Sequence, residues 1–161
     1  MQEGITRDIP DDEHIIRGIF TPFHYDIKKD KPKKEAFIQK PHSKGVSMYR
    51  SAIFNTNDCR NHAKNLINPG KKDYFALAVV STEAVRNAGS RVEDTRDANF
   101  YGHADMLHDI PDALPQEPNT PENQEKLIAC IDKILKCAKF YKDPDPQHEI
   151  WLGDDPITPL C

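Results

Sequence analysis

The stretch YFALAVV, residues 74–80, is the most continuous apolar run of the chain, and turn-forming residues border it on both sides. An apolar run of this length between turns is typical of a buried strand. We therefore expect residues 74–80 to form the central strand of a sheet. The run HIIRGIF, residues 14–20, is compact and β-branched, which predicts a first strand. Residues 36–39 and 46–50 predict two further short extended segments.

Two short helices are predicted around this sheet, each from a polar cap that precedes helical sequence. Thr56 or Asn57 caps the first helix, in which apolar residues recur along one face. Ser81 or Thr82 caps the second. Gly89 stands at its end, where a left-handed C-terminal cap favours glycine.

A longer helix is predicted over residues 121–141, because apolar residues recur there at helical spacing and Thr120 precedes a proline at the first helical position. We therefore expect an α+β fold with a small mixed or antiparallel sheet, two short helices and one long C-terminal amphipathic helix. Four parts are predicted: a flexible lead-in, an α+β core, a proline-rich connector, and a helix and tail that pack on the core or on a partner. They are residues 1–13, 14–110, 111–120 and 121–161.

The composition restricts the classes of protein to which the chain can belong. Its 161 residues correspond to one domain, and with 37% hydrophobic residues it is apolar enough to fold. The net charge of -4 provides no overall attraction to nucleic acid or anionic membranes. No apolar run approaches a membrane span, and the first residues lack the layout of a signal peptide. The four cysteines are widely spaced, so we expect reduced thiols and a cytoplasmic location.

The stretch YGHADMLHD, residues 101–109, concentrates groups that bind metals or transfer protons. His103, Asp105 and His108 offer two imidazoles and a carboxylate, a common ligand set for zinc, manganese or iron. His103 and Asp105 share one face of an extended segment, whereas His108 faces the other side unless the chain bends. A divalent metal at these three residues is one hypothesis. The alternative is that His103 bonds to a backbone carbonyl and His108 lies at the surface.

Arg17 places a charge inside the apolar first strand. A charged side chain there must reach water, a carboxylate or an anionic ligand. Together with Ser47, Tyr49 and Arg50 of the next strand, and with His103, it predicts a pocket that binds an anion through a bidentate guanidinium. The alternative is an arginine that faces solvent or pairs with a carboxylate.

The stretch KKDKPKK, residues 28–34, holds five lysines around a proline. Proline disfavours regular structure, so a solvated loop is expected here. Contact with nucleic acid is the alternative. Against it, the chain as a whole is acidic and no aromatic residue is interleaved in the run to stack on bases.

Four segments, taken in order, carry a resemblance to other proteins: EHIIR, GVSMYR, ALAVV and GHAD, at residues 13–17, 45–50, 76–80 and 102–105. Together they resemble a group of small bacterial cytosolic proteins with no established activity. This resemblance implies a single compact unit in which His103 is a recurring position. The run HIIRG, followed by a strand with Ser47 and Tyr49, also loosely resembles the first strands of ADP-ribosyltransferases, but no downstream catalytic glutamate is identified.

These observations lead to three hypotheses of function. The first is a cytosolic bacterial accessory or binding protein of a toxin, immunity or phage-defence module, which recognises a protein partner or a small anionic ligand near Arg17. The second is a metal-dependent hydrolase or nuclease in which His103, Asp105 and His108 hold an ion that activates water. The third, an ADP-ribosyltransferase-like enzyme, is implied by the resemblance alone. No cofactor other than a divalent metal is indicated, and no membrane is expected as a partner.

Overall fold

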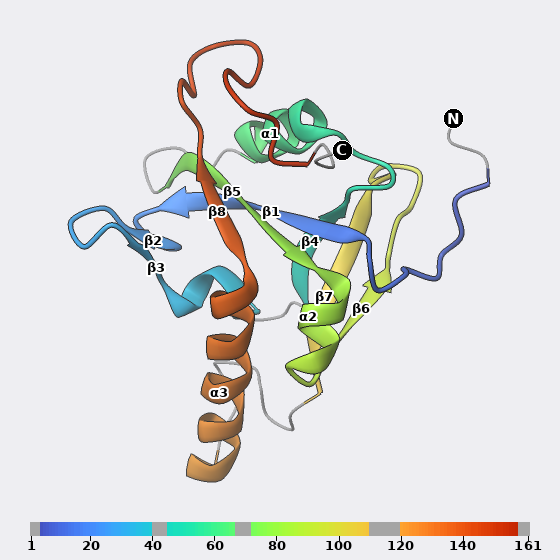
Figure 1. The fold of residues 1–161 in the computed structure, drawn as a ribbon, viewed down its shortest axis with the longest axis vertical. Helices are drawn as coiled ribbons and strands as arrows, with labels where there is room; N and C mark the ends of the chain where they lie inside the picture. Colours follow the sequence, from blue (N-terminus) through green and yellow to red (C-terminus); the bar gives the residue numbers. More distant parts are fainter. Residues whose placement is uncertain (1–3, 40–44, 67–71, 110–119, 158–161) are drawn as a thin grey trace.

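The computed structural model describes residues 4–39, 45–66, 72–109 and 120–157. In these residues six strands form an antiparallel sheet in the order β6-β7-β4-β1-β5-β8, and two more form a small hairpin (Figure 1). The strands are β1 (His14–Thr21), β2 (Tyr25–Asp26), β3 (Lys31–Pro32), β4 (Val46–Arg50), β5 (Asp73–Ser81), β6 (Ser90–Asp94), β7 (His103–His108) and β8 (Lys139–Lys142). The helices are the 3-10 helix η1 (Lys34–Phe37), α1 (Thr56–Asn65), α2 (Thr82–Asn87) and α3 (Pro121–Cys137).

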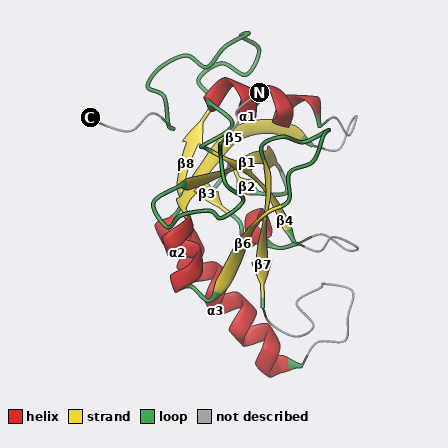
Figure 2. Cartoon of the chain, turned by 90° about the vertical axis from the view of Figure 1, so that its right-hand side faces the viewer, coloured by secondary structure: helices red, strands yellow, loops and turns green. Residues whose placement is uncertain are grey.

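The sheet separates two layers of structure. α1 lies on one face, and η1, α2 and α3 lie on the other (Figure 2). The larger apolar cluster is on the α3 side and includes Ile15 and Ile131, whereas the smaller one, below α1, includes Ile16 and Cys59. Successive residues of β1 supply both clusters because side chains alternate between the faces of a strand. The arrangement confirms the predicted α+β class, with an antiparallel sheet, two short helices and one long helix.

The predicted strands at residues 14–20, 46–50 and 74–80 are β1, β4 and β5. β5 is an interior strand, but it lies between β1 and the edge strand β8. The middle of the sheet is therefore the β4–β1 pair, and the prediction of residues 74–80 as the central strand is wrong. An apolar run indicates that a strand is buried and contains no information about the order of its neighbours.

The long helix ends earlier than its sequence predicts. α3 begins as expected, with Thr120 as N-cap and Pro121 in the first turn, but it stops at Cys137. Residues 139–142 form β8, which pairs antiparallel with β5. Phe140 packs against the rings of Tyr25 and Phe37, with centroids 6.3 and 6.1 Å away. These tertiary contacts outweigh the local preference of the segment to continue the helix.

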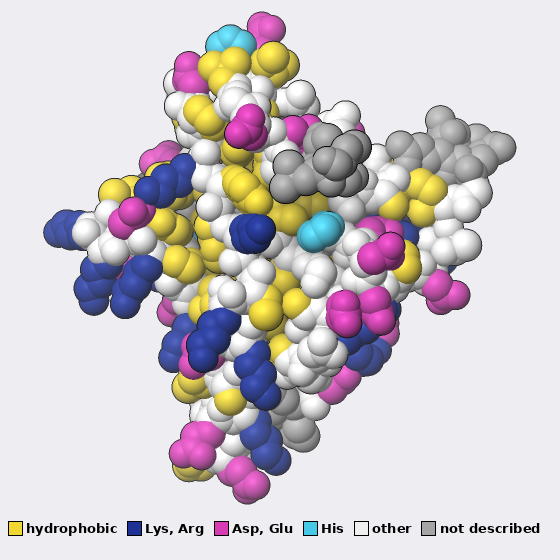
Figure 3. Space-filling model, in the orientation of Figure 1, with side chains coloured by type: hydrophobic (Ala, Val, Ile, Leu, Met, Phe, Trp, Pro, Cys, Tyr) yellow, Lys and Arg dark blue, Asp and Glu magenta, His cyan; other side chains and the backbone are white. Residues whose placement is uncertain are grey.

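Two other local predictions also differ from the structure. The extended segment expected at residues 36–39 overlaps the 3-10 helix η1, whose Ala36 and Phe37 are buried beneath α3. The lysine-rich stretch, expected as an irregular loop, contains the strand β3, which pairs with β2. This hairpin projects from the sheet, and lysine side chains gather over it at the left of Figure 3.

The N-terminal segment was expected to be a flexible lead-in, yet residues 4–13 are held against the body of the protein. Ile9 is buried with the larger apolar cluster. Arg50 donates from Nη1 to the Thr6 carbonyl at 2.7 Å, and Arg96 donates from Nη2 to the Ile5 carbonyl at 2.7 Å. The acceptors of these two hydrogen bonds are backbone carbonyls, which carry no sequence signal.

The C-terminal part also belongs to the same body. Residues 111–119 of the predicted connector lie outside the described residues, but α3 buries its apolar stripe in the larger cluster. Beyond β8, Asp143 accepts a hydrogen bond from Arg60 of α1 at 2.5 Å. The thiols of Cys59, Cys130 and Cys137 are free, as predicted for these three. Within the described parts of the chain, no helix has the length and apolar character needed to cross a bilayer.

Candidate functional site

A split in the sheet between β1 and β4 creates the candidate site. β1 pairs with β5 along its whole length, but it pairs with β4 only at Ile15↔Arg50 and Ile16↔Tyr49. Residues 46–48 of β4 pair instead with β7 on their other side. Beyond Ile16 the two central strands therefore diverge, and a cavity of about 240 Å³ opens between them.

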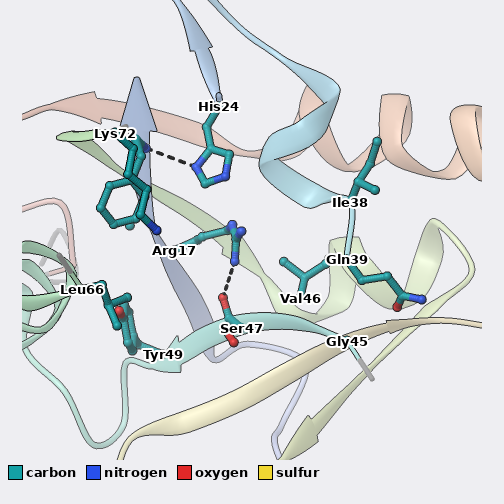
Figure 4. Close-up of a pocket in the computed structure, with 12 residues that line it drawn as sticks. Arg17, His24, Ile38, Gln39, Gly45, Val46, Ser47, Tyr49, Leu66 and Lys72 are labelled. Atoms are coloured by element: carbon teal, nitrogen blue, oxygen red, sulfur yellow. Dashed lines mark hydrogen bonds between the residues drawn. The ribbon is translucent and has the colours of Figure 1, made fainter. Parts of the chain in front are cut away.

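Arg17 spans this split. Its side chain extends from β1 toward β4 and donates from Nη1 to the Ser47 carbonyl at 2.8 Å (Figure 4). Arg17 is only 8% exposed, its Nε has no hydrogen-bond acceptor, and no described carboxylate forms an ion pair with it. Burial lowers the pKa of the guanidinium to about 10, so the side chain is still a cation at neutral pH. A buried cation without an anionic partner is unusual, and it requires an explanation.

The walls of the cavity supply further polar groups but no acid. Among the described lining residues, none is aspartate or glutamate. His24 reaches in from the turn after β1, and Gln39 lies across the cavity from it (Figure 4). Lys72, just before β5, places its ammonium 4.3 Å from the centre of the Phe20 ring, near the mouth of the cavity. Among the described lining residues, the side chains of the Lys, Arg, Asp or Glu types are those of Arg17 and Lys72, and both are cationic.

Tyr49 connects the cavity to an aromatic cluster beside α1. Burial raises the pKa of its hydroxyl, whose oxygen forms a hydrogen bond of 2.7 Å with His62 Nδ1. The His62 ring packs against Phe100, with ring centroids 4.9 Å apart, and Phe100 in turn packs against His103. Burial and the nearby His103 both lower the pKa of His62. These contacts fix the position of the Tyr49 ring in the cavity wall.

The structure brings together three of the five predicted ligand-binding residues: Arg17, Ser47 and Tyr49. Arg50, also predicted there, lies outside the cavity. Its Nε and Nη2 donate to the carboxylate of Glu13, both at 2.8 Å, and its Nη1 donates to Asp94 at 2.6 Å. Arg50 is paired with Ile15, at the closed end of the split between β1 and β4, and therefore lies away from the cavity. Arg50 instead anchors the N-terminal segment.

His103 is the fifth predicted residue, and it does not line the cavity either. It lies opposite Tyr49 in the β4–β7 ladder, and its Nδ1 is 2.7 Å from the Thr95 hydroxyl. The alternative interpretation expected a hydrogen bond from His103 to a backbone carbonyl. The structure shows a hydrogen bond to the Thr95 side chain instead.

The predicted metal cluster does not assemble in the structure. His103 and Asp105 share one face of β7, but His108 points to the other face and is buried in the larger core. In the described part of the chain, no group of three or more histidine, cysteine, aspartate or glutamate side chains is arranged to hold a metal ion. The straight strand leaves no bend to bring His108 round to the other two residues.

His108 is buried and takes part in a hydrogen-bond relay. The alternative expectation, that His108 lies at the surface, is wrong. Its Nε2 is 2.7 Å from the carbonyl of Phe37 and its Nδ1 is 2.6 Å from the hydroxyl of Ser90, which lies 3.0 Å from the Cys130 thiol. Since the carbonyl accepts from Nε2, Nδ1 is the acceptor for Ser90. Burial lowers the pKa of His108. The relay joins β6, β7, η1 and α3.

Several lining residues escaped prediction from the sequence, among them His24, Gln39 and Lys72. Each lies in or next to a turn, where no hydrophobic period indicates which way a side chain points. The Nδ1 atom of His24 accepts the Phe20 amide at 3.1 Å, which fixes the ring beside Arg17. The sequence did not predict this contact, because a histidine four residues after a strand residue is a common pattern.

The chain matches no protein-family model, no curated protein sequence and no solved structure.

Proposed function

We propose that this protein is a binding protein for a small organic anion, which it holds in the split between β1 and β4 by pairing with Arg17. One observation carries the proposal: a buried guanidinium without an ion-pair partner in the described structure lines a cavity whose described walls contain no carboxylate. The desolvation of such a charge is offset when an anion enters.

The surrounding residues support the same ligand class. Lys72 and the polar groups of Ser47, Tyr49 and Gln39 line the same space. Charged and polar groups that converge on a concave, partly apolar pocket are the usual features of a small-molecule site. Recognition of a ligand requires only these groups, which fits an accessory or binding role in a bacterial cytosol.

Thermal unfolding in the presence of small anions tests the proposal. The panel contains acetate, hexanoate, benzoate, inorganic phosphate and butyl phosphate, each added to the purified full chain at constant ionic strength. We expect at least one anion to raise Tm in a concentration-dependent way, because a ligand that binds only the folded state stabilises it. The Arg17→Met variant should lose this ligand-induced rise.

Arg91→Met is the matched control, because Arg91 lies on β6 at the surface, about half exposed, and pairs with Asp109. It should retain the response of the wild type. A panel without any effect on Tm, or an equal effect on Arg17→Met, would overturn the proposal. NAD is incubated with the protein in a separate assay because of the resemblance to ADP-ribosyltransferases, and release of nicotinamide would support that function instead.

A further inference from the structure

The hydrogen bonding of Arg17 leaves one edge of its guanidinium available. Nη1 is engaged with the Ser47 carbonyl at 2.8 Å, while Nε has no acceptor. Nε and Nη2 together form the side edge of the guanidinium, with two parallel N–H bonds. This edge matches the two oxygens of a carboxylate, which it binds in a bidentate manner. Phosphate is also bound by arginine forks, so other features must distinguish the two anions.

The position of α1 disfavours a doubly charged anion. Phosphate sites commonly use the N-terminus of a helix, where free amides and the positive end of the dipole face the ligand. Here the opposite end is present: α1 ends at Asn65, and its C-cap residue Leu66 lines the cavity. The negative end of the helix dipole therefore lies near the site, which favours a singly charged ligand over a phosphate dianion.

The apolar walls and the volume of the cavity indicate what kind of group the ligand carries beside its charged group. The apolar side chains of Phe20, Ile38, Val46 and Leu66 line the space around the charged group. Its volume of about 240 Å³ is below the range of roughly 300–1,000 Å³ that holds drug-sized ligands. An apolar body of a few carbon atoms fits this space, and a nucleotide does not.

We propose that the ligand is a monocarboxylate with a short apolar body, whose carboxylate pairs with the side edge of Arg17 and whose body contacts Phe20, Val46 and Leu66. This inference rests on the proposed function and specifies its ligand class. The carboxylate then provides the acceptor that Nε lacks, and the apolar walls exclude water from the ion pair.

Calorimetric titration of the full chain with matched ligands tests the ligand class. Hexanoate is compared with acetate, which lacks the body, with hexanamide, which lacks the charge, and with butyl phosphate, which replaces the head group. We expect hexanoate to bind at least about 10-fold tighter than each of the others. Acetate lacks four methylenes, and burial of two of them is enough for a 10-fold difference. Hexanamide lacks the charge that strengthens the hydrogen bonds to Arg17, and butyl phosphate brings a second negative charge near the C-terminal end of α1.

Two variants test the two halves of the ligand separately. Arg17→Lys keeps the charge but removes the fork, and it should weaken hexanoate binding roughly 10- to 100-fold. Leu66→Ser changes a side chain that is 42% exposed at the rim, so the fold should tolerate it. It should weaken hexanoate binding and leave acetate binding unchanged. Arg91→Lys, at the surface of β6, should bind all four ligands as the wild type does.

The possible results separate this inference from the function on which it rests. Butyl phosphate that binds as tightly as hexanoate would overturn the monocarboxylate while leaving the anion site intact. Equal binding of hexanoate by Arg17→Lys and the wild type would overturn the fork, and an unchanged hexanoate affinity in Leu66→Ser would overturn the contact with the apolar body. If none of the anions binds, the proposed function itself fails.

Discussion

Arg17→Met is expected to make the ligand-free protein more stable, although it removes a charged hydrogen bond. Arg17 is 8% exposed and has no ion-pair partner among the described residues. Burial lowers its pKa from 12.5 to about 10. Since one pKa unit corresponds to about 1.4 kcal/mol, keeping the cation in the split costs about 3 kcal/mol of stability.

The substitution also removes a favourable contact, which sets the net effect. The hydrogen bond from Nη1 to the Ser47 carbonyl has a charged donor, and such a bond contributes about 2 kcal/mol. Methionine is flexible and apolar, so it can occupy the space that the arginine side chain leaves. The difference between the two effects is a gain of about 1 kcal/mol in the free energy of unfolding.

Urea unfolding followed by circular dichroism at neutral pH measures this difference. The midpoint should rise while the slope with urea stays unchanged. Arg60→Met is the matched control, because Arg60 is also fully buried but pairs with Asp143 at 2.5 Å. That variant leaves the carboxylate buried and unpaired, and it should lose about 3–5 kcal/mol.

A loss of more than about 2 kcal/mol in Arg17→Met would refute the reasoning, because it exceeds the contribution of the charged hydrogen bond that the substitution removes. Arg17 would then stabilise the fold as Arg60 does, and its charge would have a structural explanation. A gain in stability together with a lost response to anions shows instead that the buried charge is kept for a ligand.

Three further predictions concern the frame around the site. Arg50→Met leaves the buried Glu13 carboxylate without its cation and removes one of the three arginines that pair with Asp94, so we expect a loss of about 3–5 kcal/mol in urea unfolding and faster proteolysis of the N-terminal segment. Burial lowers the pKa values of His108 and His62 in the folded protein below the ordinary value of 6.5. On acidification the two imidazoles therefore become protonated in the unfolded state at a higher pH than in the folded state. The stability present above pH 6.5 should therefore fall as the pH drops toward the folded pKa values, and urea midpoints between pH 8 and 5 measure this loss. Gly18→Ala places a Cβ 2.6 Å from that of Ala63 in α1, and the forced shift of the helix should cost about 1–3 kcal/mol in the same assay.

Each of these predictions has a result that contradicts it. Wild-type stability and proteolysis in Arg50→Met would show that the N-terminal segment does not depend on the buried ion pairs. A flat pH profile, or one that a His62→Gln/His108→Gln double variant leaves unchanged, would exclude the two histidines as its source. A Gly18→Ala protein of unchanged midpoint would mean that α1 moves without cost.

Much of the fold follows from local patterns. β-Branching predicted β1, and residues 46–50 were expected to be extended, as β4 is. Of the two caps expected for α2, Ser81 and Thr82, Ser81 is the N-cap, and Gly89 follows the end of the helix as expected. The cap of α1, expected at Thr56 or Asn57, was placed one or two residues too late, since Asn55 forms a capping box with Asp58. The misplaced end of α3 has a different cause: β8 forms because β5 offers it a free edge, and an edge supplied by a distant strand is absent from the local sequence.

The candidate site was predicted only in part from the sequence, and there is a physical reason why the rest could not be predicted. The sequence alone determined that Arg17 is a charge within an apolar strand and that Ser47 and Tyr49, two residues apart, face the same side. Only the tertiary structure decided that Arg17 has no described anionic partner while Arg50 has two, because ion pairs depend on distances between distant segments. It also decided that β1 and β4 separate after Ile16, since the length over which two strands pair is set by what each strand packs against.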